Sequence, residues 1–112
     1  MTFIKINKTM YPAEITGKVQ DYDWDNRESK AITLEMDYET AAALFVDGLA
    51  WSIVQREEVE TENGKETVET EFDNSEYNLA GDITVHRDGT ITAKMGKLTD
   101  LEAAYEIMLG GM

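Results

Sequence analysis

The sequence has no cysteine, one proline and one histidine in 112 residues. Without cysteine the chain can form no disulfide, no cysteine-ligated zinc site and no thiolate nucleophile. No apolar run approaches the length of a membrane-spanning helix, and the first residues, MTFIKINKTM, lack the hydrophobic stretch of a signal peptide. We therefore expect a soluble intracellular protein, folded as one domain over residues 1–112 because no linker-like tract interrupts it.

Positive charge is also scarce. Ten lysines and arginines stand against 23 aspartates and glutamates, for a net charge of −13. This is more than the magnitude of about 2 to 8 that keeps a small domain soluble. A field of this sign repels nucleic acid and anionic membranes. We expect no direct contact with either, and a protein partner with a basic surface instead.

The negative charge is concentrated in residues 55–73, QREEVETENGKETVETEFD. The dipeptide Asn63-Gly64 predicts a β-hairpin with a two-residue type I′ turn, which would place Glu58 opposite Glu69. Alternation along the strands then yields one strongly acidic face. The residues expected to contact a basic partner are Glu58, Glu60, Glu62, Glu69 and Glu71. The alternative is a solvated ribbon that only keeps the protein soluble.

Hydrophobic alternation in the other segments predicts further strands. These are residues 3–6, 11–19, 31–36 and 49–54, and a pair on either side of Asp88-Gly89. Pro12 indicates an edge or bulge position, and residues 20–29 are predicted to be a polar loop. For the last pair, a three-residue loop with Gly89 as a bulge keeps the apolar residues on one face. It pairs Val85 with Ile91 and Asp82 with Lys94.

Two helices are predicted, at residues 38–47 and 99–109. Asp37 is the expected N-cap of the first, and Gly48 its C-cap. Its apolar face would carry Tyr38, Ala41, Ala42 and Phe45. Thr99 and Glu102 form a capping box for the second helix, with an apolar stripe of Leu101, Ala104, Tyr105 and Met108. The expected class is α+β: a mostly antiparallel sheet of about six or seven strands, two short helices and a protruding acidic β-hairpin.

Few residues suggest chemistry. Asp21, Asp23 and Asp25 resemble the start of a calcium-binding loop, but Ile32 stands where a bidentate glutamate is needed, so they are weak calcium candidates. His86 is expected on the polar face of its hairpin, with no nucleophile placed beside it. There is no glycine-rich phosphate loop. We expect no catalytic residue and no cofactor, and hence a non-enzymatic protein.

The two tryptophans differ in their surroundings. Trp51 shares a strand face with Leu49 and Ile53, which predicts core packing. Trp24 lies in the acidic loop, where core and interface are equally compatible with the sequence. If it is exposed, it is the best candidate for an interface anchor, since exposed aromatics contribute much of the energy at protein contacts.

The segments on either side of the hairpin carry a resemblance. The stretches DYDWDNRESKAITLEMDYETAAALFVDGLAWSIV and EFDNSEYNLAGDITVHRDGTITAKMGKLTDLEAAYEIMLGGM resemble small acidic proteins of uncharacterised role from phages and prophages of Gram-positive gut bacteria. Genes of that group often lie in or near the tail and lysis region. The resemblance implies a phage origin and a location in the host bacterial cytoplasm or the virion. It identifies no site residues.

Two functions follow as hypotheses. The first is a non-enzymatic accessory protein of the phage particle, tail-associated, which would self-associate or bind a tail protein. The second is an inhibitor of host defence, such as an anti-CRISPR protein. Its acidic surface would mimic nucleic acid and occupy a basic channel of a nuclease, with carboxylates meeting arginine and lysine. The net charge favours the second hypothesis, and the resemblance favours the first.

Overall fold

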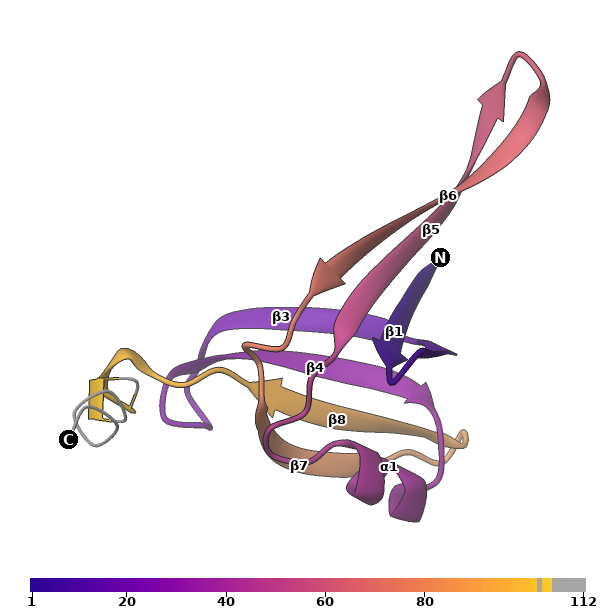
Figure 1. Ribbon diagram of the computed structural model, residues 1–112. Coiled ribbons are helices and arrows are strands. Elements are labelled where there is room, and N and C mark those ends of the chain that lie inside the picture. The colour runs from indigo at the N-terminus through magenta and orange to yellow at the C-terminus, as the bar shows by residue number, and fades with distance from the viewer. Residues whose placement is uncertain (103, 106–112) are drawn as a thin grey trace.

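The computed structural model describes residues 1–102, 104 and 105, which form eight strands and two short helical segments (Figure 1). The elements are β1 (Thr2–Ile6), β2 (Thr9–Pro12), β3 (Glu14–Asp21), β4 (Arg27–Glu35), α1 (Tyr38–Leu44), β5 (Ser52–Thr61), β6 (Gly64–Asp73), β7 (Leu79–Val85) and β8 (Thr90–Gly96). They make two four-stranded sheets, ordered β2-β1-β5-β6 and β3-β4-β8-β7, in which every pairing is antiparallel. The predicted α+β class is confirmed, but two sheets replace the single sheet of six or seven strands.

The predicted strand at residues 11–19 is divided between the two sheets. Residues up to Pro12 belong to β2 and pair with β1, whereas β3 begins at Glu14 and pairs with β4. The sequence shows one apolar pattern here because both halves are extended, and only the pairing partners differ. Pro12 lies on an edge strand, as expected, because an edge position does not require its missing N–H.

The predicted polar loop at residues 20–29 is shorter than expected. β3 continues to Asp21 and β4 begins at Arg27, so the connection comprises only residues 22–26. Asp21 and Arg27 are both buried, at 1% and 4% exposure. The hydrophobic pattern did not predict these strand ends because both residues are charged. A buried charge is tolerated only where other parts of the fold supply a partner, and the local sequence does not show such partners.

Helix α1 begins as predicted and ends early. The Asp37 carboxylate accepts a hydrogen bond from the Thr40 N–H at 2.7 Å, which confirms the N-cap. The helix ends at Leu44 rather than residue 47, although Gly48 does have the expected positive φ of 85°. The buried face was predicted incorrectly in part: Ala41 and Phe45 are buried, but Tyr38 and Ala42 are exposed.

The second helix is described only at its start. Residues 100–102, 104 and 105 are helical, and the rest of the predicted span 99–109 lies outside the described residues. The capping box is confirmed, because the Thr99 N–H donates to Glu102 Oε1 at 2.9 Å and the Glu102 N–H donates to Thr99 Oγ1 at 3.2 Å. Leu101, Ala104 and Tyr105 are exposed, so this part of the predicted apolar stripe does not enter the core.

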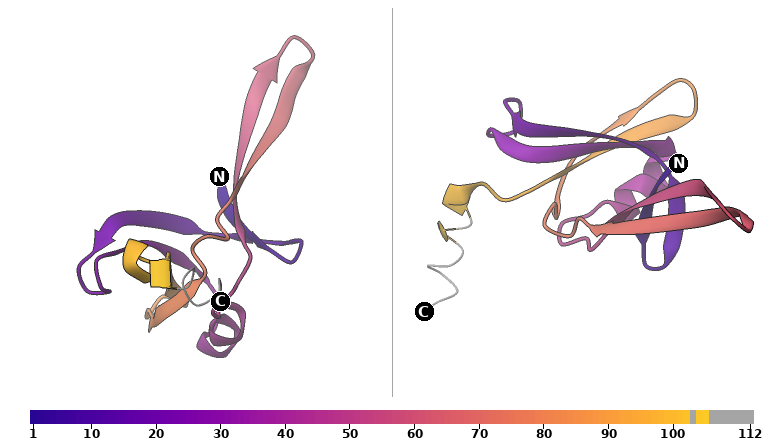
Figure 2. Two further views of the ribbon diagram at one scale, coloured as in Figure 1. Left: turned by 60° about the vertical axis from the view of Figure 1, so that its left-hand side comes forward. Right: turned by 90° about the horizontal axis from the view of Figure 1, so that it is seen from above.

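A cluster of buried side chains joins the two sheets and α1. Figure 2 shows these elements in two further views. Ile4 and Ile53 come from the first sheet, Ile32 and Ile91 from the second, and Phe45 follows α1. Trp51 is 2% exposed and its indole N–H donates to the Tyr77 carbonyl at 2.9 Å, which confirms the prediction that it packs in the core.

The β7–β8 hairpin has the predicted turn and a bulge that was not predicted. Val85 pairs with Ile91 and Gly89 has a φ of 90°, as expected for the three-residue loop. The register then shifts between Ala80 and Ile83, so two residues of β7 lie opposite Lys94. Asp82, which was predicted to pair with Lys94, is one of these two residues and shares the position with Gly81, so the regular one-to-one pair that was predicted is replaced by the bulge.

Candidate functional site

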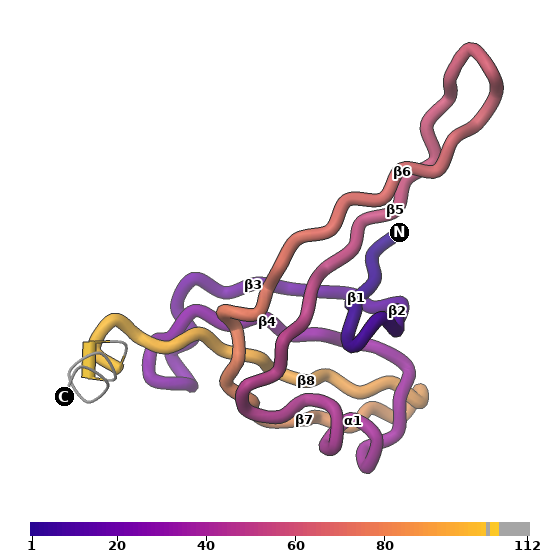
Figure 3. The backbone as a smooth tube through the Cα atoms, viewed as in Figure 1, coloured from indigo at the N-terminus to yellow at the C-terminus, as the bar shows by residue number. Residues whose placement is uncertain are grey.

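The outer half of the β5–β6 hairpin projects away from both sheets (Figures 1 and 3). We call residues 57–68 the acidic ribbon. β1 pairs with β5 only over residues 52–55, and among the described strands β6 pairs with β5 alone. Every residue from 57 to 73 is exposed. The molecule is correspondingly long, with extents of 57 × 36 × 25 Å.

The turn of the hairpin lies one residue earlier than predicted. Glu62 and Asn63 form it, and neither has positive φ. Gly64, the first residue of β6, has a φ of 113°, so the predicted type I′ turn at Asn63-Gly64 is wrong. The register moves by two residues: Glu58 lies opposite Thr67, and Arg56 opposite Glu69. Because strand faces alternate with a period of two, this shift leaves each strand residue on the predicted face.

The five predicted contact residues differ in their surroundings. Glu58, Glu60, Glu69 and Glu71 share one face, but Glu62 lies in the turn rather than on that face. Glu69 Oε1 is 2.6 Å from Arg56 Nη2, and Glu71 Oε1 is 3.1 Å from Lys5 Nζ. Within the described part of the chain, Glu58, Glu60 and Glu62 form no ion pair. The carboxylates most available to a partner are therefore those furthest from the sheets.

The opposite face of the hairpin is mixed. Val59, Val68 and Phe72 lie on it with exposures of 42%, 47% and 52%. Glu57 lies opposite Val68, and Glu66 lies opposite Val59. The acidic ribbon thus carries carboxylates on both faces and at its tip, together with a few exposed apolar side chains. Such a surface can meet cationic and apolar groups at once.

Trp24 does not belong to this surface. It lies in the β3–β4 connection of the second sheet, where its indole packs so closely over Gly96 that an added Cβ would come within 2.7 Å of the ring. The Arg27 guanidinium lies 5.0 Å from the ring centroid. Trp24 is half-buried, which weakens its candidacy as an interface anchor, and the structure does not bring it to the ribbon carboxylates.

The aspartates of the suspected calcium loop have structural partners. Asp21 Oδ2 accepts from Lys94 Nζ at 2.8 Å and from Ser29 Oγ at 3.1 Å. The hydrogen bond from Lys94 is the main cause that holds the pKa of Asp21 below its usual value. Asp25 lies 3.5 Å from Arg27, and Asp23 is exposed. In the described residues no three acidic or histidine side chains are arranged to hold a metal ion.

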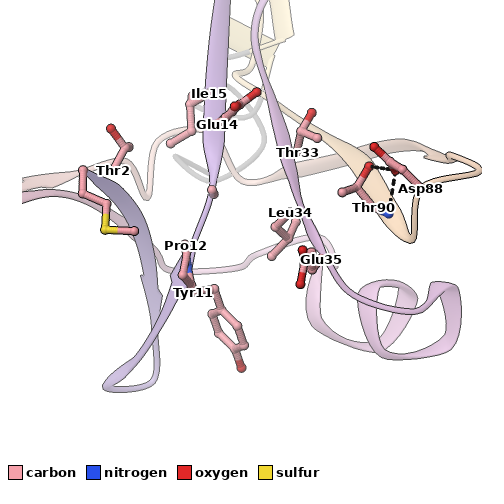
Figure 4. A pocket seen from close by; sticks show the side chains of 12 residues that line it. Thr2, Tyr11, Pro12, Glu14, Ile15, Thr33, Leu34, Glu35, Asp88 and Thr90 are labelled. Atoms are coloured by element: carbon pink, nitrogen blue, oxygen red, sulfur yellow. Dashed lines mark hydrogen bonds between the residues drawn. The ribbon is translucent and has the colours of Figure 1, made fainter.

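Sequence reasoning missed an open groove at the junction of the sheets (Figure 4). Its volume is about 970 Å³. The apolar part of the lining includes Tyr11, Ile15 and Leu34, and the rim carries Glu14 and Glu35. Four separate segments contribute, so no local motif could have indicated it. His86 is not among the lining residues; its Nε2 lies 2.7 Å from Thr92 Oγ1. The groove can hold a small or extended molecule, and its lining includes the Thr90 hydroxyl, which donates to Asp88 Oδ1 at 2.6 Å (Figure 4).

Comparisons with known protein families, with curated proteins and with solved structures found no match. None of the helices that the structure describes has the length and apolar character needed to cross a membrane.

Proposed function

We propose that this protein is a non-enzymatic binding protein that engages a basic surface of a protein partner through the acidic ribbon. The observation that carries the proposal is the isolation of residues 57–68, which contain five glutamates and one lysine and contribute nothing to the core. A segment that only completed the fold would bury side chains. Carboxylates that meet arginine or lysine form the stronger, charge-assisted class of hydrogen bond.

The partner depends on the origin of the protein. The resemblance to phage and prophage proteins favours an accessory role in the particle, with a tail protein as partner. The shape and charge of the ribbon support a second candidate, an inhibitor of a host defence nuclease. A narrow projection with carboxylates on both faces can enter a basic channel that normally holds nucleic acid, where potentials of opposite sign accelerate association.

The test is affinity capture from lysate of infected or lysogenic host cells with two charge-matched variants. In the ribbon variant Glu58→Gln, Glu60→Gln and Glu62→Gln are combined. The control combines Glu14→Gln, Glu35→Gln and Asp82→Asn, three exposed acids elsewhere that form no ion pair with the described residues. Both variants lose the same charge, so a difference between them reports the ribbon.

We expect the wild type and the control to retain a partner that the ribbon variant loses, with retention weakened by added salt because exposed charges are screened. A captured tail protein supports the accessory role, and a nucleic-acid enzyme supports the inhibitor. Equal capture by both variants would overturn the proposed use of the ribbon.

A further inference from the structure

The edges of the two sheets differ in how they are protected from further strand pairing. β2 has four residues and ends in Pro12. The edge strands of the second sheet, β3 and β7, are each interrupted by a register shift. Short strands, prolines and bulges are common devices that prevent pairing with other chains. β6 has none of these: it pairs with β5 over ten residues without interruption.

The orientation of the β6 backbone follows from contacts on the far side of β5. The Arg56 N–H donates to the Met1 carbonyl at 2.9 Å, and the Arg56 carbonyl accepts from the Met1 amino group at 2.8 Å. Arg56 therefore directs its backbone groups away from β6. In an antiparallel pair the residue opposite does the same, so Glu69 directs its N–H and C=O to the outer edge. By alternation, Thr67 and Glu71 do so too.

The side chains beside this edge select its occupant. Glu69 and Glu71 lie on one face of β6, and Val68 and Phe72 on the other. β6 carries four acidic side chains and one lysine, so a second copy would bring two strands of net negative charge together, which is destabilising where like charges lie opposite one another. A strand that alternates basic and apolar residues would match both faces.

We infer that β6 accepts an extended basic segment of the partner as an additional antiparallel strand. Backbone hydrogen bonds form with the outward groups of Thr67, Glu69 and Glu71. Lysine or arginine side chains of the segment lie on the face of Glu69 and Glu71, and apolar side chains lie on the face of Val68 and Phe72. Strand addition to an exposed sheet edge is a general mode of peptide recognition. This inference rests on the proposed function and specifies the chemistry of the partner.

The first test uses a capped peptide of alternating lysine and valine and two N-methylated forms of it. In the antiparallel arrangement the lysine N–H groups point to β6 and the valine N–H groups point away. N-methylation at the lysines is expected to weaken binding to the full-length protein by about tenfold or more, because several hydrogen bonds are lost. N-methylation at the valines, with the same composition and charge, is expected to preserve binding. Equal binding of the two forms would overturn the inference.

The second test changes the protein. Thr67→Pro removes an outward N–H without changing charge or the β5–β6 hydrogen bonds, and Thr67→Ala is the control that keeps the N–H. We expect only Thr67→Pro to weaken binding of the unmethylated peptide. If both variants bind it as the wild type does, strand addition is wrong. If Thr67→Pro disturbs the ribbon itself, the comparison of the two N-methylated peptides on the wild-type protein still tests strand addition.

The outcomes also separate this inference from the proposed function. If binding to the captured partner is lost in the ribbon glutamine variant but unchanged by Thr67→Pro, the ribbon binds by charge alone and only the inference fails. If neither change affects the partner, both fail. A wild-type dimer that Thr67→Pro dissociates would identify a second copy as the occupant and overturn the basic segment.

Discussion

Gly96 shows how one missing side chain organises an end of the second sheet. The ring of Trp24 and the side chain of Arg27 occupy the space that a Cβ on Gly96 would need, each at 2.7 Å. Arg27 is held in turn by the Lys97 carbonyl at 3.1 Å. The sequence left Trp24 undecided between core and interface because the glycines it packs on, Gly81 and Gly96, are far away along the chain.

This packing predicts a contrast between two glycines. We expect Gly96→Ala to lower the free energy of unfolding by about 1 to 3 kcal/mol, the usual cost of overpacking. Gly17 is also in a strand but has open space around it, so Gly17→Ala is expected to be neutral or stabilising by up to about 1 kcal/mol. Chemical denaturation measures both. Equal effects of the two substitutions would show that the contact with Trp24 does not constrain Gly96.

At the scale of elements, the second helix is attached to the sheet through its own cap. The Glu102 carboxylate accepts hydrogen bonds from Arg27 at 2.7 and 3.2 Å while it also caps the helix through Thr99. The hydrogen bond from Arg27 is the main reason that the pKa of Glu102 falls from 4.5 to about 2. The capping box was predictable from its local spacing, but the partnership with Arg27, 75 residues away, was not.

A pH dependence of stability follows from the lowered pKa of Glu102. A carboxyl with a lower pKa in the folded state stabilises the fold above its unfolded pKa and loses that contribution as pH falls from about 4.5 towards about 2. We expect the wild type to lose more stability than Glu102→Gln between about pH 6 and about pH 3. Denaturant unfolding at both values measures this. Identical losses would mean that Glu102 contributes nothing to the acid sensitivity.

The hairpin illustrates which properties of an element are local. Its existence and its two faces followed from Asn63-Gly64 and from alternation, and the faces survived an error of two residues in the register. The exact register did not follow, because Asn-Gly is compatible with more than one turn geometry. The register changes the charge contacts: Glu69 lies opposite Arg56 and forms an ion pair with it, whereas the sequence placed Glu69 opposite Glu58.

At the scale of the whole molecule, the core and the acidic ribbon are separable. Replacing residues 58–67 by Asn-Gly, so that Glu57 and Val68 close the turn as a hydrogen-bonded pair, removes only exposed side chains. We expect Tm to change by less than about 5 °C, equivalent to about 1 kcal/mol for a domain of this size. Binding to the captured partner should be lost. Thermal unfolding followed by circular dichroism is the measurement, and an unfolded product would show that the ribbon supports the fold.

The overall charge and most strands were readable from the sequence because both depend on composition or on neighbours along the chain. So were the cap at Asp37 and the core position of Trp51. Residues 11–19 appear as one strand in sequence because extension is local, whereas membership of a sheet is not. The partition into two sheets depends on pairings such as β1 with β5, which join residues about fifty positions apart.

Which charged side chains are buried and which strand edges stay open depend only on these distant pairings. Asp21 and Arg27 can be buried because residues from the other end of the chain pair with them: Lys94 with Asp21, and Glu102 with Arg27. The groove exists because four segments diverge at one place, and β6 is an open edge because no other described strand lies beside it. The sequence alone therefore determined an acidic α+β protein with a charged hairpin. Contacts between distant segments determined which of its carboxylates and backbone groups remain available to a partner.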